Sequence, residues 1–386
     1  MKFTADTRTL KSACDTAKRA VSGKCNIPAL DGLLLRFDNA DGRETLRIAG
    51  YDLEVCIETG IACDVDGDDS LSVVVYEPGE CVLDASVLCS ILGKLSGDIV
   101  SIEVDKRLRA KLSCGDSEYK LTAMPADDFP ELPSAKGDAP AITIPTAELQ
   151  RMIRGTVFAA STCTETKPIH TGVLFEHDGT TLTLAAIDGY RAAVRKTDQA
   201  ERTGEQAHFV VPQKALRELA GMKTAAEQVM IFQHKRHITF IVGDVQITSR
   251  LLDGAFMDYS AAIPQNWDVE LTVDRLDLLA AIERVSLVNT EKVRAATRMT
   301  LCPNEGAIML TCETGVGEAR ELVSVDGCTK ALQIGFNHRL LADAIAACDD
   351  DTVKLRVNRA TQPVIIVPEE GDRYLYLVLP VRLGKD

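Results

Sequence analysis

Apolar residues in the middle of the chain first follow a helical spacing and then form short runs of strand length. Leu149, Met152, Ile153, Thr156, Val157 and Ala160 recur at the spacing of one helix face, which predicts a half-buried helix. Apolar runs at 172–176, 182–186 and 192–194 follow, separated by Asp-Gly pairs at 178–179 and 188–189. Such pairs between apolar runs predict strands joined by tight turns. The unit is one helix followed by three short strands.

This unit occurs three times along the chain. Leu10, Leu149 and Leu278 each open a helical stripe, and apolar runs follow each stripe. A second helix is predicted in every copy, around Leu88, Leu216 and Leu340. Repetition at this scale predicts an α+β protein of three similar domains in tandem, each with two helices packed on antiparallel sheets. Pro-containing linkers place the predicted domains at 1–134, 141–262 and 268–386.

The first and last copies add details to this prediction. Asp84 is the expected N-cap of the second helix of copy one, and strands are expected at 99–105, 108–114 and 118–124. The apolar run 374–383 is predicted to be a strand, but it continues past the strand pattern and through Pro380. It is either the last core strand or an exposed segment that engages a partner.

Composition limits the class of protein. The 386 residues are 46% hydrophobic and 26% charged, which is ordinary for a globular chain of two or three domains. No apolar run reaches the length of a membrane span, and the start Met1-Lys2-Phe3-Thr4 lacks a signal-peptide core. We therefore expect no membrane partner and a cytoplasmic location.

The twelve cysteines have no Cys-x-x-Cys spacing. Residues such as Cys14, Cys56, Cys89 and Cys163 are expected to be small buried hydrophobic side chains rather than disulfides or metal ligands. His234 and His237 flank Lys235-Arg236, which predicts a hairpin tip rather than a zinc pair. We predict no metal and no cofactor.

Catalytic signatures are mostly absent, since the chain has no Gly-x-Ser-x-Gly, phosphate-loop or His-Glu-x-x-His motif. A binding protein is therefore favoured over an enzyme. Two alternatives stay open at this point: a metal-dependent nuclease that uses the abundant carboxylates, and a scaffold that never meets DNA.

The formal net charge of −14 does not exclude a local basic surface. Basic side chains recur on the predicted helices, so that a surface built from these helices would suit a nucleic-acid backbone. These basic residues are Lys11, Lys18, Arg151, Arg154, Lys214, Arg217, His338 and Arg339.

Short segments in all three copies resemble one family, the bacterial sliding clamp, which is the beta subunit of DNA polymerase III. These segments are Met1-Lys2-Phe3-Thr4, Pro28-Ala29-Leu30, Asp52-Leu53-Glu54, Asp128-Phe129-Pro130, Asp188-Gly189-Tyr190-Arg191, Ile334-Gly335-Phe336-Asn337 and Leu379-Pro380-Val381-Arg382-Leu383. The resemblance implies a non-catalytic processivity factor for DNA replication. It also implies a head-to-tail homodimer closed into a ring, with helices lining a hole that holds double-stranded DNA without sequence specificity.

The resemblance further implies three sets of site residues. A groove for peptides of the replicative polymerase, the clamp loader and repair polymerases would comprise His170, Ile187, Gly189, Tyr190, Arg191, Ala192, Met257, Ala261, Ala262, Asn337, Leu340, Pro363, Leu377, Val378, Leu379, Pro380, Val381, Arg382 and Leu383. The resemblance implies DNA contacts from Lys24, Lys167 and Lys214, and the basic surface of the predicted helices adds Lys11, Arg151 and Arg217. Dimer contacts are expected from Tyr119, Leu121, Leu287 and Val288. His170, Ala192, Met257 and Ala261 depart from common family choices, which affects the preferred peptide.

Overall fold

The computed structural model describes residues 1–23, 26–40, 43–64, 73–133, 140–163, 167–202, 207–289 and 295–383. Within them, the predicted threefold repetition is confirmed, because the same order of elements occurs three times. Each repeat begins with a strand that leads directly into a helix, continues through a set of strands to a second helix, and ends in three more strands.

The bounds of the elements are as follows. The first repeat contains β1 (Lys2–Asp6), α1 (Thr7–Lys18), β2 (Gly32–Ala40), β3 (Arg43–Tyr51), β4 (Val55–Asp64), β5 (Val73–Glu77), β6 (Glu80–Asp84), α2 (Ala85–Leu92), β7 (Ile99–Val104), β8 (Arg109–Cys114) and β9 (Ser117–Thr122). The second contains β10 (Ile142–Pro145), α3 (Thr146–Arg154), β11 (Gly172–His177), β12 (Leu182–Ile187), β13 (Arg191–Thr197), β14 (Glu201–Arg202), β15 (Ala207–Pro212), α4 (Gln213–Ala220), β16 (Gln228–Gln233), β17 (His237–Val242) and β18 (Val245–Arg250). The third contains β19 (Val269–Asp274), α5 (Arg275–Val285), β20 (Thr297–Cys302), β21 (Ala307–Thr314), β22 (Gly317–Ser324), β23 (Leu332–Phe336), α6 (His338–Ala346), β24 (Thr352–Val357), β25 (Val364–Pro368) and β26 (Tyr374–Val378).

Four helices begin at a side chain that caps the first turn. The carboxylates of Asp6, Asp84 and Asp274 each accept a hydrogen bond from a backbone N–H of the turn that follows, and the Asn337 side chain does the same for α6. These bonds satisfy N–H groups that have no partner within the helix. The expected N-cap at Asp84 is confirmed, with a distance of 2.7 Å to the nitrogen of Val87.

The Asp-Gly turns form for a local reason. The Asp178 carboxylate accepts the backbone N–H groups of Thr180 and Thr181, and these bonds lower its pKa to about 2. Asp188 holds the next turn in the same way, and the glycine after each aspartate has a positive φ, +113° at Gly179 and +90° at Gly189. Glycine adopts such angles at no steric cost.

The first predicted helix of repeat two is shorter than its apolar stripe. Helix α3 ends at Arg154, directly before Gly155, and a 3-10 turn covers Val157–Ala159. Thr156, Val157 and Ala160 are nevertheless buried, so the stripe marks the core correctly although the helix stops early. Glycine has a low helix propensity and commonly follows a helix end, which accounts for the stop.

The chain folds into two compact units. Unit 1 comprises Met1–Thr146 and Gly221–Leu251, and unit 2 comprises Ala147–Ala220 and Leu252–Asp386. Repeat two contributes to both units, because strand pairing crosses the borders between repeats. In unit 1, β18 pairs with β4, and in unit 2, β13 pairs with β26. The predicted boundaries at 134, 141, 262 and 268 concern the sequence repeats, which do not coincide with these two compact units, and they remain predictions.

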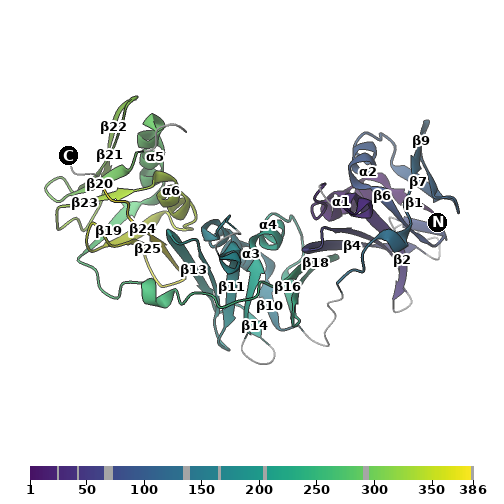
Figure 1. Cartoon of the computed structure of the whole chain (residues 1–386), viewed down its shortest axis with the longest axis horizontal. Helices are drawn as coiled ribbons and strands as arrows, with labels where there is room; N and C mark the ends of the chain where they lie inside the picture. Colours follow the sequence, from purple (N-terminus) through teal and green to yellow (C-terminus); the bar gives the residue numbers. More distant parts are fainter. Residues whose placement is uncertain are drawn as a thin grey trace. The chain divides into compact units, whose positions relative to one another are not determined.

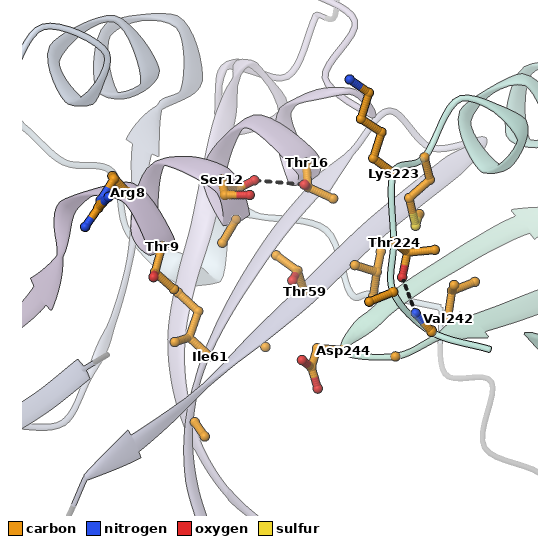
Figure 2. Close-up of a pocket in the computed structure, with 18 residues that line it drawn as sticks. Arg8, Thr9, Ser12, Thr16, Thr59, Ile61, Lys223, Thr224, Val242 and Asp244 are labelled. Atoms are coloured by element: carbon orange, nitrogen blue, oxygen red, sulfur yellow. Dashed lines mark hydrogen bonds between the residues drawn. The ribbon is translucent and has the colours of Figure 1, made fainter. Parts of the chain in front are cut away.

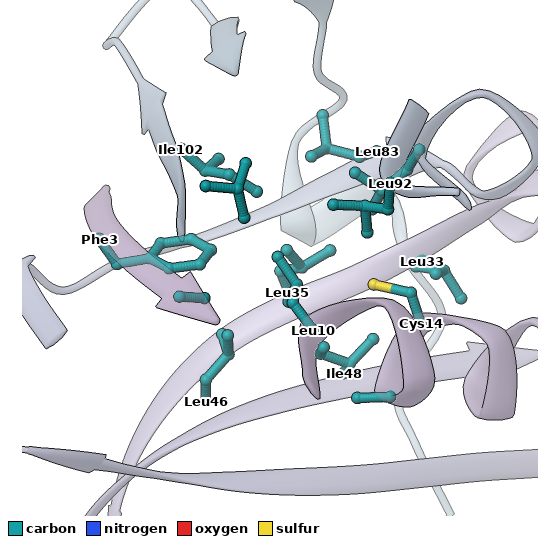
Figure 3. Close-up of a cluster of buried hydrophobic side chains, with 14 of the residues drawn as sticks. Phe3, Leu10, Cys14, Leu33, Leu35, Leu46, Ile48, Leu83, Leu92 and Ile102 are labelled. Atoms are coloured by element: carbon teal, nitrogen blue, oxygen red, sulfur yellow. The ribbon is translucent and has the colours of Figure 1, made fainter. Parts of the chain in front are cut away.

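Unit 1 is built on a sheet in which the described strands follow the order β10-β16-β17-β18-β4-β5-β1-β7-β8-β9, with β3 also paired to β4. Helices α1 and α2 lie side by side (Figure 1). Leu10 and Cys14 of α1 point into a core with Phe3, Leu33 and Leu46 (Figure 3). Each fully buried leucine of this kind contributes roughly 1.5–3 kcal/mol of hydrophobic stabilisation.

Unit 2 is built on two antiparallel sheets. One follows the order β15-β11-β12-β13-β26-β25-β24-β19 and the other β22-β21-β20-β23. Helices α5 and α6 lie side by side in this unit (Figure 1). The predicted terminal strand is shorter than expected, because β26 ends at Val378 and residues 379–383 leave the sheet. The apolar run 374–383 therefore combines a core strand with a partly exposed tail.

A close approach between α1 and β3 at Gly50 gives a stability prediction. A Cβ atom at Gly50 would lie 2.2 Å from the carbonyl oxygen of Ala17, so Gly50→Ala must displace the backbone of α1. Overpacking of this kind costs roughly 1–3 kcal/mol, and we expect the melting temperature in scanning calorimetry to fall by several degrees. Gly315→Ala is the matched control, since a Cβ there meets no atom within 4 Å. Equal melting temperatures for the two variants would contradict the packing described.

Candidate functional site

The pairing of β13 with β26 brings residues of repeats two and three together. Arg191 lies opposite Val378 and Ala192 opposite Leu377 in an antiparallel register. The pairing places the Asp188-Gly189 turn, which precedes β13, next to the tail that follows β26. The predicted groove residues from the two repeats therefore meet in unit 2.

Two backbone hydrogen bonds fix the tail after β26. The N–H of Leu379 donates to the carbonyl of Tyr190 at 2.9 Å, and the N–H of Val381 donates to the carbonyl of Gly335 at 2.8 Å. Glycine at 335 favours this approach, because a Cβ there would lie 2.8 Å from the carbonyl oxygen of Val381. Tyr190, Leu379 and Val381 are exposed large hydrophobic side chains along this tail.

An apolar cluster lies beside the tail, and we call it the sheet cluster. It contains the buried residues Ile187, Ala192, Ile365, Val367 and Leu377, with Phe256, Tyr259 and Leu375 packed against it. His170 joins it indirectly, since its ring lies 5.7 Å from that of Phe256 in an edge-to-face arrangement. Three predicted groove residues, Ile187, Ala192 and Leu377, therefore belong to one contiguous apolar cluster that is buried beneath the surface, with His170 beside it.

Arg191 has a structural role in this region. Its side chain is only 12% exposed, donates to Asp188 at 2.9 Å and to Asp343 at 2.6 Å, and lies 5.2 Å from the centre of the Phe158 ring. A guanidinium with two carboxylate partners is fixed in place. Arg191 therefore ties the Asp188 turn to α6 and positions its neighbours Tyr190 and Ala192.

A second buried arginine underlies the same sheet. Arg195 is 3% exposed, forms an ion pair with Asp349, donates to the carbonyl of Arg151 at 3.2 Å, and lies over the ring of Tyr374. Gly155 leaves the space that the Arg195 side chain occupies, because a Cβ at position 155 would lie 2.3 Å from the guanidinium. Removing Asp349 would leave the buried guanidinium of Arg195 without its carboxylate partner, which is unfavourable, so this contact helps to hold repeats two and three in register.

The remaining predicted groove residues lie around this centre. Met257, Ala261 and Ala262 are exposed, the last two within a 3-10 turn, and Asn337 caps α6, which also carries the half-buried Leu340. Val378 is buried, Pro380 and Leu383 are half-buried and Arg382 is exposed. Pro363 lines a cavity beside the sheet cluster with Ile365 and Leu375.

The predicted DNA-contacting residues divide between the units. In unit 1, Lys11 forms an ion pair with Asp15, which raises the pKa of the ammonium, and Lys24 lies outside the described residues. In unit 2, Lys167, Lys214 and Arg217 are exposed. Arg151 pairs with Glu148 and lies 4.0 Å from Asp349, so its charge is partly compensated within the protein.

Two basic residues that were not predicted from the sequence lie near Lys11. Arg8 and Lys223 line a hollow of about 770 Å³ in unit 1, with hydroxyl groups of Thr9, Ser12 and Thr224 (Figure 2). A positively charged side chain in the first turn of a helix, such as Arg8 in α1, interacts unfavourably with the positive end of the helix dipole. This unfavourable position of Arg8 could have been recognised in the sequence. Lys223 gave no such signal, because it lies in a segment without periodicity.

The predicted dimer residues lie at sheet edges or beside them. Tyr119 and Leu121 belong to β9, an edge strand of unit 1, and are half-buried against the core. In unit 2, Leu287 is 79% exposed and Val288 half-buried in a 3-10 turn next to the edge strand β22. Leu322 on β22 and Val316 before it are also exposed, and the sequence had not singled them out.

Most of the described cysteines are buried. Cys14, Cys56 and Cys89 are buried as expected, but Cys163 is exposed, so the expectation was wrong for that residue, which lies in a loop outside the regular elements. No group of three or more potential metal ligands occurs among the described residues. Within the same residues, no helix is long and apolar enough to cross a membrane.

Comparison with known proteins decides the family. Models of the DNA polymerase III beta subunit match residues 1–133 (N-terminal domain), 143–258 (central domain) and 260–382 (C-terminal domain). The chain belongs to the bacterial beta sliding clamp family.

Individual clamps agree over their whole length. The beta sliding clamp of Synechococcus elongatus is 32% identical over 388 residues, which cover 99% of this chain and 100% of the relative. The crystal structure of the Bacillus subtilis clamp superposes with a TM-score of 0.91 at 30% identity and covers 100% of both chains. A Pseudomonas aeruginosa clamp structure gives a TM-score of 0.86 at 28% identity and covers 99% of this chain and 100% of its own. The fold prediction of three tandem clamp domains is confirmed.

The burial of His170 within this clamp fold predicts a pH effect. Burial lowers the pKa of His170 below the ordinary 6.5, with a smaller contribution from Lys167. The unfolded chain then takes up a proton at higher pH than the folded chain does. Stability is therefore complete above about pH 7 and falls as the pH drops through 6.5. We expect His170→Leu to reduce the loss of melting temperature between about pH 7.5 and pH 5.5.

The control is Ile169→Leu, because it alters the neighbouring buried side chain and removes no titratable group. This variant is expected to keep the pH response of the unchanged protein. If His170→Leu kept the whole response as well, the burial of His170 would not be the cause.

Proposed function

We propose that this chain is a processivity factor of DNA replication: a non-catalytic ring that encircles duplex DNA in the cytoplasm and tethers the replicative polymerase. The observation that carries the proposal is the match of all three repeats, in order, to the three domains of the DNA polymerase III beta subunit. A match confined to one repeat would support a shared domain, whereas the full-length match supports the whole assembly.

Ring closure is proposed through the unpaired sheet edges. Both borders between repeats are made by antiparallel strand pairing, β4 with β18 and β13 with β26. Within the described residues, β9 ends the sheet of unit 1 and β22 ends a sheet of unit 2. Edge strands present unpaired backbone groups that another chain can take up. A head-to-tail homodimer that pairs β9 with β22 of a second copy, and packs Leu287, Val288 and Leu322 there, would repeat the mode of contact already used twice.

We propose that scattered lysine and arginine side chains contact the phosphates of DNA and that no side chain reads the nucleobases. Lys11, Lys167, Lys214 and Arg217, together with Arg8 and Lys223, are suited to phosphate oxygens, which carry no sequence information. Weak contacts of this kind let a protein slide, and the closed ring would prevent escape. Arg151 and Lys24 stay in the proposed set, although the carboxylates around Arg151 argue for a smaller contribution from that residue.

Partner binding is proposed at the tail and the sheet cluster. Leu379, Val381 and Tyr190 are exposed apolar side chains beside the buried Ile187 and Leu377. Apolar walls with a few polar anchors, such as Arg382 and Asn337, fit an extended peptide from the replicative polymerase, the clamp loader or a repair polymerase. His170 and the small Ala192 would shape which apolar side chain of the peptide is preferred.

Retention on circular DNA tests the ring. We expect the protein, once placed on nicked circular DNA by a bacterial clamp loader, to stay bound at high salt and to be lost when the circle is cut. High salt weakens phosphate contacts strongly but does not affect topological linkage. Gel filtration of the DNA-bound fraction before and after cutting gives the measurement. Equal retention on the circle and the linear form would refute the ring.

A dimer variant serves as the control in this assay. Leu287→Asp places a charge on a side chain that is 79% exposed, so the subunit itself should fold normally. Desolvating that carboxylate in an interface is unfavourable. We expect the native mass to fall from about twice 41.8 kDa to a single 41.8 kDa chain, with loss of retention on the circle.

Peptide affinity tests the groove. We expect the double variant Leu379→Ala and Arg382→Ala to bind a polymerase-derived clamp-binding peptide at least tenfold more weakly, which corresponds to about 1.4 kcal/mol. The exposed leucine provides apolar contact and the arginine a polar anchor, and both are lost. Fluorescence anisotropy of a labelled peptide measures the change.

Leu276→Ala is the control, because Leu276 is an exposed leucine on α5, outside the proposed groove. It should leave the affinity unchanged, and both proteins should keep the dimer mass. Unchanged affinity in the double variant would remove the tail from the peptide site.

A further inference from the structure

A fixed segment of chain borders the sheet cluster of unit 2, and we call residues 263–267 the crossing segment. The Asn358 side chain donates to the carbonyl of Asn266 at 2.7 Å and accepts the N–H of Asp268 at 2.8 Å. These two bonds hold the crossing segment at the end of β24. It is therefore a built part of the surface rather than a loose connection.

Trp267, at the end of this segment, is held in a defined position. The guanidinium of Arg356 lies 3.9 Å from the centre of the Trp267 ring and is itself bound to Glu270 at 2.7 Å. Cation–π contact with an anchored arginine orders the ring. The side chain is nevertheless 42% exposed, which leaves much of an ordered aromatic surface open to a partner.

The crossing segment and the sheet enclose a cavity of about 240 Å³, which we call the Trp267 cavity. Apolar walls come from Ile263, Pro264, Pro363, Ile365, Leu375 and Trp267. Pockets for whole small-molecule ligands usually measure about 300–1,000 Å³. The Trp267 cavity is thus of a size for one ring-bearing side chain rather than for a complete small molecule.

The Trp267 cavity is continuous with the proposed peptide groove. Ile365 and Leu375 line it and also belong to the sheet cluster with Ile187, Ala192 and Leu377. Ile365 lies opposite Leu377 in the pairing of β25 with β26. A peptide on the sheet cluster therefore needs only a short extension to reach Trp267.

We propose that the Trp267 cavity is an additional subsite that receives an aromatic side chain flanking the groove-binding segment of a partner peptide. This inference rests on the proposed peptide groove and adds a specificity element to it. An aromatic ring fits because the cavity offers an ordered indole and apolar walls, with amide groups of Asn266 and Asn358 at its border. Aromatic pairs contribute about 0.5–1.5 kcal/mol beyond area burial, and partners with such a flanking residue would be preferred.

The chain offers a direct readout, because Trp267 is its single tryptophan. The probes are a short polymerase-derived clamp-binding peptide and versions extended at either end by one to three glycines and a phenylalanine. Matched peptides carry alanine in place of that phenylalanine. Affinity is measured by anisotropy, and tryptophan emission is recorded with excitation where tyrosine does not absorb.

One extended phenylalanine peptide is expected to bind roughly 3- to 10-fold more tightly than its alanine match and to shift the emission of Trp267. Trp267→Leu should abolish that gain while leaving the affinity for the short peptide unchanged. The thermal melt of Trp267→Leu establishes that it is folded, and the emission of the unchanged protein decides the matter independently.

The outcomes separate the two proposals. If the short peptide fails to bind, the proposed groove is wrong. If the short peptide binds but no phenylalanine extension improves affinity or alters Trp267 emission, the subsite is refuted and the groove stands.

Discussion

Antiparallel strand pairing across the borders between repeats is the constraint on which this structure depends. Strand β4 of repeat one pairs with β18 of repeat two, and β13 of repeat two pairs with β26 of repeat three. Sheets therefore run from one repeat into the next. Backbone hydrogen bonds specify such a border with little demand on side-chain identity. This explains how a chain about 30% identical to the Bacillus subtilis clamp keeps the same architecture over its full length.

The border in unit 2 differs on its two sides. On one side, the buried Arg195 forms an ion pair with Asp349 next to the stacked rings of Tyr374 and Tyr376. The sheet cluster, with Phe256 and Tyr259 packed against it, is apolar. A charged pair is specific about partner and geometry, whereas an apolar surface accepts many shapes. The two kinds of contact thus separate the task of holding repeats in register from that of receiving variable peptides.

Much of the fold could be predicted from the sequence, because each repeat carries the same local signals. The helices that contain Leu10, Leu149 and Leu278 and the Asp-Gly turns at 178 and 188 depend mainly on nearby residues. The errors arose where local pattern and tertiary structure disagree. The apolar stripe after Arg154 continues in the core without helical geometry, and the run after Val378 leaves the sheet although its composition does not change.

The candidate site was harder to predict, because its parts are distant in sequence. The partnership of Arg191 with Asp343 spans more than a hundred residues, and Arg8 and Lys223 meet only through tertiary structure. The space opposite Gly155 has a further consequence for the history of this fold. Any larger side chain there would collide with the guanidinium of Arg195, and a residue without a positive charge at 195 would remove the ion pair with Asp349. Substitutions at 155 and 195 are therefore expected to occur together in evolution.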